Sequence, residues 1–356
     1  MDEKQFTKWM QNNGLIDISK HYKDCFKNII QKCLNAKNED FFILGDLGTK
    51  DSRISPIITM GYYLAAKELN LNTKLFIRNS TPLVHDNEEL IKHLSALKPK
   101  SIITMNLSGR LSGLGVLGKS YRSFAKKAKH KFTSVSDLRS LDTRYLKYLM
   151  KAMNVDYTKL QQNGERIKKI LDNGNIIHAT TKKGTDLYYN IKGKTAISND
   201  GNYSKPGMGG NIPAGEVYIP PRSKKGIYGK VVIDGSIKTH KGTMLVKHPV
   251  TLTIENDEVI NISGLRESKL LNESLNRALL KSKYEWGVKR LSEFGIGINP
   301  NAKIVGVTIV DEKSLGTAHV AIGSNAWFGG TVYAINHYDQ VFKNPKIYVD
   351  DKLLKV

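Results

Sequence analysis

The sequence predicts an α/β Rossmann-like domain over residues 1–175, followed by an α+β domain over residues 176–356. Two observations support this division. In the first part, short apolar runs alternate with segments of helical periodicity, which is typical of βαβ units around a mostly parallel sheet. Beyond residue 175, strand-like segments punctuated by glycine and proline dominate, with one strong helical pattern among them. The length of 356 residues fits two domains of ordinary size.

The elements of the first domain follow from its apolar runs in chain order. Strands are predicted at 41–44, 74–77 and 101–105, and helices at 56–70, 88–97, 119–130 and 142–171. Because these strands alternate with helices, right-handed crossovers would place them in one parallel sheet.

The second domain is predicted to consist mainly of strands. These lie at 185–191, 226–234, 244–254 and 303–310, and the one strong helix covers about 267–291. No internal repeat interrupts this order.

The chain is strongly basic, with 55 Lys and Arg against 33 Asp and Glu and a formal net charge of +22. The stretch between Glu89 and Asp137 contains no acidic residue, which predicts an acidic ligand at segment 92–131, although a solvated lysine-rich face would look the same. Nucleic acid is an unlikely partner because few aromatic residues interleave there. The basic residues of the segment are Lys92, Lys98, Lys100, Arg110, Lys119, Arg122, Lys126, Lys127, Lys129 and Lys131.

The sequence carries no signal for a membrane or an oxidising compartment. No apolar run approaches the roughly 18 residues that span a bilayer, and the acidic, polar start is unlike a secretory signal. Cys25 and Cys33 are too few for a disulfide framework or a thiolate metal cluster. We therefore expect a cytoplasmic protein.

Residues 113–120, GLGVLGKS, satisfy the phosphate-binding pattern G-x-x-x-x-G-K-[ST] between a predicted strand and a predicted helix. The pattern follows the third strand rather than the first, and its intervening residues are apolar. A chance match, or a milder anion-binding turn at a helix start, accounts for it equally well.

Five residues of the second domain have the chemistry and the setting of metal ligands. Glu216 follows a Gly-Asn-Ile-Pro-Ala-Gly turn, Glu293 precedes a glycine-rich stretch, and His319 lies in a short apolar strand. His337 and Asp339 are two positions apart, so on a strand both would face the same side. Imidazoles with carboxylates suit zinc, manganese, cobalt or ferrous iron.

Each of these residues also has a purely structural explanation. A histidine in an apolar strand is commonly a hydrogen-bonded core residue, Asp339 could cap a turn, and Glu216 could pair with Arg222. His178, His240 and His248 lack comparable settings and are predicted to be structural or surface residues.

Four segments occur in an order that resembles a known superfamily. They are GNIPAGEV, EFGIGINPNA, DEKSLGTAHVAIGSN and the GG…NHYD stretch. Together they resemble the aminopeptidase T/aminopeptidase S metallopeptidase superfamily, which also contains 2,5-dihydroxypyridine dioxygenase. The resemblance covers about residues 176–342, and the first domain is compatible with it.

The resemblance implies two alternative ligand sets. The peptidase branch would hold two metal ions with Glu216, Glu293, His319, His337 and Asp339, whereas the dioxygenase branch would hold one ferrous ion with His319, His337 and Asp339. The peptidases carry a catalytic tyrosine seven residues after the first histidine, where this chain has Ala326. Tyr338 or Tyr333 could take its place.

These features predict a catalytic metal-binding second domain. The first prediction is a hydrolase of the aminopeptidase type, with two Zn, Co or Mn ions, Glu216 or Glu293 as general base and Tyr338 as a further catalytic group. The second is a dioxygenase with one Fe(II) that opens a hydroxylated N-heteroaromatic ring. The third is an inactive relative that binds an acidic peptide. A small peptide or small-molecule substrate and a homodimer are expected, with the site facing the first domain.

Overall fold

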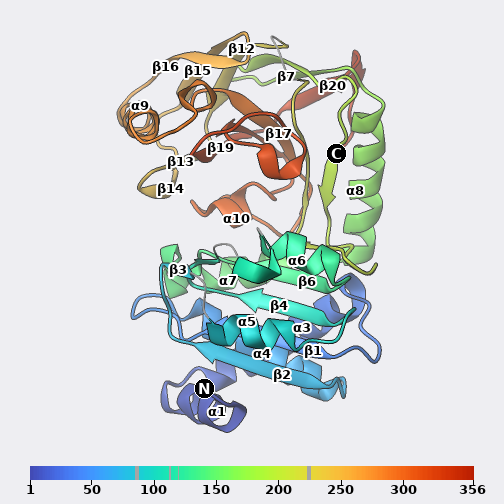
Figure 1. Ribbon diagram of the computed structural model, residues 1–356. Helices are drawn as coiled ribbons and strands as arrows, with labels where there is room; N and C mark the ends of the chain where they lie inside the picture. The colour runs from blue at the N-terminus through green and yellow to red at the C-terminus, as the bar shows by residue number, and fades with distance from the viewer. Residues whose placement is uncertain (85–87, 112–113, 119, 223–225) are drawn as a thin grey trace. The chain divides into compact units, whose positions relative to one another are not determined.

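The computed structural model describes residues 1–84, 88–111, 114–118, 120–222 and 226–356. They form two compact units (Figure 1). The first contains Met1–Thr158 and Gly201–Ala214, and the second contains Lys159–Asp200 and Gly215–Val356. This division differs from a single boundary near residue 175, because residues 201–214 return to the first unit and add a strand to its sheet.

A parallel sheet forms the centre of the first unit. Its strand order is β10-β6-β4-β1-β2, and its pairings are parallel throughout. The predicted α/β class is therefore confirmed. The strands are β1 (Phe41–Asp46), β2 (Thr73–Arg78), β4 (Ile102–Asn106), β6 (Lys131–Val135) and β10 (Gly209–Asn211), and a short parallel pair joins β3 (Leu83–Val84) to β5 (Arg110–Leu111).

Helices surround this sheet. They are α1 (Glu3–Asn12), α2 (Ile16–His21), α3 (Lys23–Asn28), α4 (Ile54–Glu68), α5 (Glu88–Ser95), α6 (Tyr121–Lys127) and α7 (Leu146–Met153). Helix α4 is apolar on nearly every side and is buried along most of its length. Gly61 lets Phe26 pack directly on α4, because a Cβ at Gly61 would lie 2.1 Å from Cε2 of Phe26.

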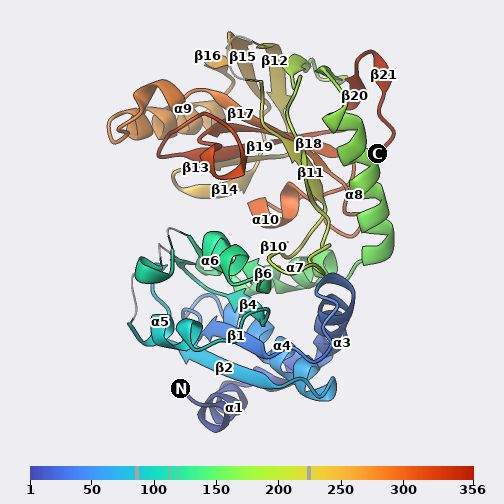
Figure 2. The same cartoon turned by 45° about the vertical axis from the view of Figure 1, so that its right-hand side comes forward.

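The second unit contains two antiparallel sheets, which confirms the predicted α+β class (Figure 2). One has the order β14-β13-β19-β18-β17-β11-β9, and the other has the order β16-β15-β12-β8-β7-β20-β21. The strands of the first sheet are β9 (Ile197–Asn199), β11 (Glu216–Ile219), β13 (Ser236–Thr239), β14 (Gly242–Leu245), β17 (Leu291–Gly297), β18 (Thr317–Gly323) and β19 (His337–Lys343).

The second sheet and three helices complete this unit. The strands are β7 (Ile176–Thr180), β8 (Asp186–Asn190), β12 (Ile227–Ile233), β15 (Val250–Glu255), β16 (Glu258–Ser263), β20 (Lys346–Val349) and β21 (Lys352–Leu353). The helices are α8 (Tyr157–Asp172), α9 (Arg266–Leu279) and α10 (Thr308–Asp311).

The strand predicted at 303–310 is wrong, because this segment is a loop that leads into helix α10. The carboxylate of Asp311 accepts hydrogen bonds from the backbone N–H groups of Val305, Gly306 and Val307, at 2.7, 3.0 and 2.8 Å. These bonds fold the loop around one side chain and satisfy donors that a strand would have paired with a neighbour.

Two predicted helices are also shorter than expected. The pattern at 142–171 is divided between α7 and α8, and the helix predicted to reach residue 291 ends at Leu279. Beyond it, Glu285–Gly287 forms a 3-10 turn before β17 begins at Leu291. In both segments the apolar periodicity continues through a turn, so the sequence pattern overestimated the length of the helix.

Candidate metal centre

All five predicted ligands lie on adjacent strands of the first sheet in the second unit. Glu216 begins β11, Glu293 lies in β17 and His319 lies in β18. His337 and Asp339 lie at the start of β19. Because β19, β18, β17 and β11 are neighbours in the sheet, residues distant in the sequence meet on it.

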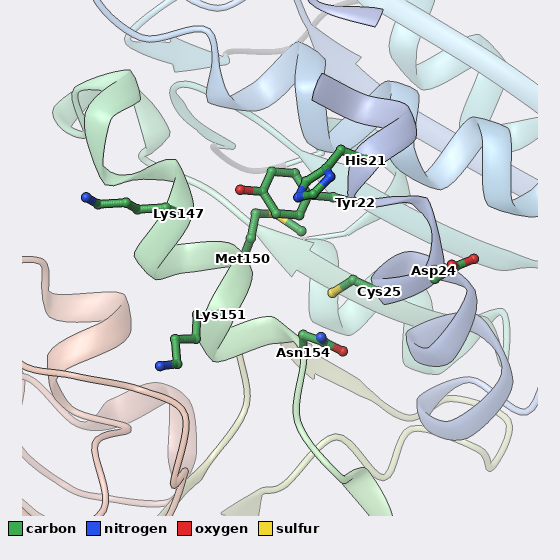
Figure 3. Close-up of a pocket in the computed structure, with 8 residues that line it drawn as sticks. All are labelled: His21, Tyr22, Asp24, Cys25, Lys147, Met150, Lys151 and Asn154. Carbon is green, nitrogen blue, oxygen red and sulfur yellow. The ribbon is translucent and has the colours of Figure 1, made fainter. Parts of the chain in front are cut away.

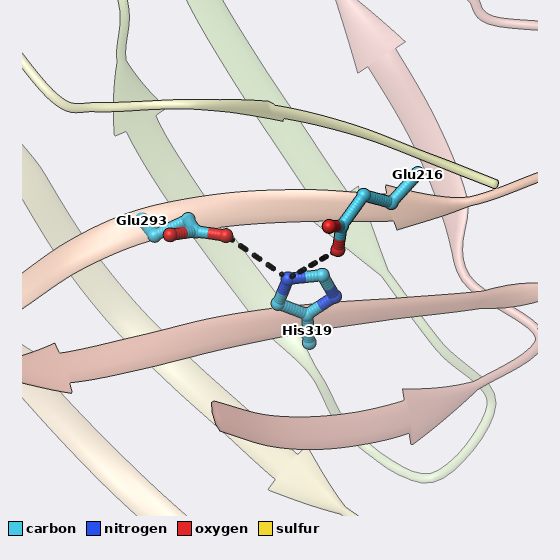
Figure 4. A group of neighbouring side chains, drawn as sticks. All are labelled: Glu216, Glu293 and His319. Carbon is cyan, nitrogen blue, oxygen red and sulfur yellow. Dashed lines mark hydrogen bonds and ion pairs between the residues drawn. The ribbon is translucent and has the colours of Figure 1, made fainter. Parts of the chain in front are cut away.

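The imidazole of His319 lies between two carboxylates (Figure 4). Its Nε2 is 3.2 Å from Oε1 of Glu293 and 3.8 Å from Oε2 of Glu216. Gly295, the residue paired with His319 across β17 and β18, makes room for the ring. A Cβ at Gly295 would lie 2.1 Å from Cε1 of His319. The glycine-rich stretch after Glu293 therefore has a steric role in the site.

His337 is held in the orientation typical of a metal-binding imidazole. Its Nδ1 lies 2.8 Å from the backbone oxygen of Ser324 and donates to it, since a carbonyl only accepts. Its Nε2 therefore points to the carboxylates, 3.0 Å from Oδ1 of Asp339 and 3.7 Å from Oε2 of Glu293. A backbone carbonyl behind the ring is a common way to fix the ligand nitrogen of a histidine.

The charges of the cluster shift one another's pKa values. Burial lowers the pKa of His319 and His337, but the carboxylates of Glu293 and Asp339 respectively outweigh it and raise both to about 9. Burial raises the pKa of Glu216, while Lys313 opposes that rise. Burial would also raise the pKa of Asp339, but His337 and Lys238 hold it well below its usual value. A buried site of this kind favours a bound cation.

Three overlapping sets of side chains could each hold a metal ion, with ligand atoms within 4.8 Å of one another. The sets are Glu216–Glu293–His319, Glu293–His337–Asp339 and Glu312–His319–Asp339. Glu293 belongs to two of them. None of these sets, drawn from the described residues, combines His319, His337 and Asp339, the three ligands that the resemblance implies for a dioxygenase with one ferrous ion.

Glu312 and two lysines belong to this cluster but were missed in the sequence. Lys313 is fully buried, and its Nζ lies 2.5 Å from Oε1 of Glu216 and also binds the carboxylate of Glu312. Lys238, on β13, places its Nζ 3.2 Å from Oδ2 of Asp339. Glu312 and Lys313 stand just before the strand that contains His319, and this position could have pointed to them. A turn separates them from that strand, so the sequence does not show which way their side chains point.

The two tyrosines considered as replacements for the catalytic tyrosine have different settings, and the role of Tyr338 stays a prediction. Side chains alternate along a strand, so Tyr338 lies on the opposite face of β19 from His337 and Asp339. Tyr333 is half exposed and packs against Tyr284, with ring centroids 5.6 Å apart. Ala326 begins a 3-10 turn whose next residue, Trp327, contacts the ring of His337 edge-on at 4.7 Å.

Several charges of the basic segment are paired within the first unit. Arg110 binds Asp137 at 2.7 Å, Lys131 binds Glu39 at 2.5 Å and Lys98 lies 3.8 Å from Asp40. Lys131 is buried as well. An acidic ligand at segment 92–131 stays a prediction, with fewer charges open to it than the sequence suggested.

The GLGVLGKS match lies partly outside the described residues, since Gly113 and Lys119 are not among them. Its last residue, Ser120, caps helix α6 by accepting a hydrogen bond from the N–H of Ser123 at 3.1 Å. The hydroxyl that would bind magnesium in a phosphate-binding loop is therefore used locally.

A pocket of about 370 Å³ lies in the first unit, between α2, α3 and α7 (Figure 3). Its lining includes the thiol of Cys25 and the side chains of His21, Lys147 and Lys151. Burial raises the pKa of Cys25 to about 12, so this thiol is not a ready nucleophile. The pocket contains none of the metal-ligating candidates.

No helix among the described residues has both the length and the apolar character needed to cross a lipid bilayer.

A family model described as NicX, 2,5-dihydroxypyridine 5,6-dioxygenase, matches residues 143–355. This chain belongs to that family. The match covers more than half of the chain and includes all six acidic and histidine donors of the cluster. The predicted superfamily is thereby confirmed, and the chain belongs to a family of enzymes.

Solved structures that share the fold include the following two. One is 2,5-dihydroxypyridine dioxygenase from Pseudomonas putida KT2440, with a TM-score of 0.73 at 16% identity, covering 95% of this chain and 96% of that one. The other is wild-type AmpT from Thermus thermophilus, with a TM-score of 0.60 at 13% identity, covering 94% and 98%. At these identities they establish the fold alone, and that fold serves both predicted branches.

A curated protein from Clostridium botulinum (strain Loch Maree / Type A3), named cell division protein DivIB, is 29% identical over 194 residues. The similarity covers 53% of this chain and 68% of that protein.

Proposed function

We propose that this protein is a metal-dependent dioxygenase that opens a small hydroxylated aromatic ring, with a dihydroxypyridine as the first substrate to test. The family match supports this reaction, and the residues beside the donor cluster support an aromatic substrate. The observation that carries the proposal is the contact between Trp327 and His337.

Trp327 presents an aromatic surface directly beside a metal-ligating histidine. Its indole meets the imidazole of His337 edge-on at 4.7 Å, and 58% of the residue is exposed. Phe328 stands behind it, with its ring centroid 5.4 Å from that of Trp327. Such a surface can stack on a planar ring. The same region gives less support to peptide hydrolysis, because Ala326 has no hydroxyl that could assist at the carbonyl of a peptide substrate.

The donor set fits a divalent cation. Glu293, His337 and Asp339 would hold it, with His319 next to Glu293, and the carbonyl of Ser324 fixes which nitrogen of His337 faces it. Ferrous iron bound there would supply the activation of dioxygen that such mixed imidazole and carboxylate sites support. The protein's own side chains would orient the ring through Trp327 and neutralise the cation through buried carboxylates.

A dinuclear hydrolase of the aminopeptidase type is the second candidate. One observation favours it: Glu293 belongs to two of the three donor sets, which is where a carboxylate shared by two Zn, Co or Mn ions would lie. An inactive relative that binds an acidic peptide would need no metal at all.

Parallel assays separate these candidates. The purified protein is loaded anaerobically with Fe(II) and given 2,5-dihydroxypyridine while oxygen uptake is measured. In a second arm it is loaded with Zn, Co or Mn and given leucine p-nitroanilide. We expect oxygen uptake of one O₂ per ring lost, with both oxygen atoms in the product. Peptide hydrolysis without oxygen uptake would establish the hydrolase instead.

A further inference from the structure

We infer that Lys313 takes the place of a second metal ion, so that this cluster accepts one divalent cation rather than two. The inference rests on the proposed metal site but not on the reaction catalysed there.

Lys313 has the position that a second cation would need. Its ammonium group lies between the carboxylates of Glu216 and Glu312 and is completely shielded from solvent. These two glutamates belong to two of the three donor sets. Oε1 of Glu216 also accepts a hydrogen bond from Nδ2 of Asn199 at 3.2 Å, so this oxygen is fully engaged.

The charge balance of the cluster leads to the same conclusion. Four carboxylates, those of Glu216, Glu293, Glu312 and Asp339, face the ammonium groups of Lys313 and Lys238. If both imidazoles are neutral when the metal is bound, as an imidazole ligand must be, two negative charges remain. One divalent ion neutralises them, whereas a second would leave a buried excess of positive charge, which is costly in a low-dielectric interior.

The remaining donor set is the one that Lys313 does not touch. Glu293, His337 and Asp339 keep their ligand atoms within 4.8 Å of one another. Lys238 binds Oδ2 of Asp339, while Oδ1 faces Nε2 of His337 at 3.0 Å. This arrangement also gives Glu216 and Glu312 a role in a site for one ion, because both bind Lys313.

Metal counting tests the inference. Wild-type protein and variants are equilibrated with Mn²⁺, dialysed, and measured for metal per chain by plasma mass spectrometry, with calorimetric titration as a second count. We expect one ion for the wild type, two for Lys313→Met and one for the double variant Glu216→Gln/Lys313→Met, which loses the lysine together with one of its carboxylates.

Lys183→Met is the matched control, because Lys183 pairs with the buried Asp234 at 2.9 Å in the same unit but touches none of the donors. It should keep one ion. Two ions in the wild type would overturn the inference while leaving a metal enzyme, as would one ion in a folded Lys313→Met. No ion in the wild type would remove the proposed metal site as well. If Lys313→Met does not fold, the wild-type count decides.

Discussion

The second unit contains two histidine–aspartate pairs on its two sheets, and they differ in their surroundings. His178 and Asp186 lie 2.7 Å apart across β7 and β8, with Asp186 largely exposed. His337 and Asp339 lie 3.0 Å apart within β19, with Asp339 buried. The two pairs have the same chemistry but different neighbours.

Those neighbours account for the difference in role. The ring of His178 is stacked on that of Tyr188, with ring centroids 4.2 Å apart, so the first pair lies against an aromatic surface. The second pair is joined by Glu293, Lys238 and the carbonyl of Ser324. A histidine–aspartate pair becomes a candidate metal site when burial and further charges converge on it.

The largest difference between the two pairs is expected when each aspartate is removed. Asp339→Ala removes a buried ligand and leaves Lys238 facing His337, so we expect metal binding and turnover to fall to background. Asp186→Ala should change neither, because exposed ion pairs contribute about 0–1 kcal/mol and this one is outside the site. Metal content and activity of both variants are measured, with circular dichroism to check folding. Equal effects would contradict the distinction between the pairs.

A glycine-to-alanine exchange in each unit should separate the effect of packing on stability from its effect on the metal site. Gly295→Ala would push a Cβ into the ring of His319, and Gly61→Ala would push one into Phe26. Each should lower the free energy of unfolding by about 1–3 kcal/mol, as overpacking does.

Their effects on the metal site should diverge. Because Gly295 makes room for His319, whose Nε2 lies 3.2 Å from the ligand Glu293, Gly295→Ala should weaken Mn²⁺ binding about tenfold to 100-fold, the range found when support of a ligand is lost. Gly61→Ala should leave it unchanged. Calorimetric titration compares the two variants, and unchanged affinity in a folded Gly295→Ala would argue that His319 does not support the ligand Glu293.

The smallest effect is expected from the aromatic side chains near each histidine. Trp327→Ala should raise KM for an aromatic substrate about threefold to tenfold, consistent with about 0.5–1.5 kcal/mol for an aromatic contact. Tyr228→Ala removes the exposed ring that stacks on Tyr188 at 5.0 Å and should leave KM unchanged. Steady-state kinetics distinguish the two, and an unaltered KM for Trp327→Ala would remove the stacking role.

The sequence predicted the fold class and singled out five of the six candidate donors because their signals are local. Apolar runs marked β1, β2 and β4, and the two-residue spacing of His337 and Asp339 placed both on one face of β19. Glu216 and Glu293 were identified by the glycine-rich turns beside them. The convergence of these residues was expected from the resemblance and is seen in adjacent strands of one sheet.

Other features depend on side-chain contacts that a sequence pattern does not show, so they could not be predicted. Lys313 resembles any lysine in a basic chain until the fold encloses it between Glu216 and Glu312. Residues 303–310 are apolar enough for a strand, yet the three backbone bonds to Asp311 turn them into a loop and helix. Lys313 acts on the distant Glu216, whereas Asp311 acts on the loop just before it, and an apolar pattern shows neither contact.

The central claim is that the buried cluster on β11, β17, β18 and β19 is a metal centre. Crystals of the protein equilibrated with Mn²⁺ and measured with anomalous scattering test it directly. We expect one anomalous peak within coordination distance of Glu293, His337 and Asp339. The absence of a peak there, with those side chains paired only to one another and to the lysines, would contradict the account.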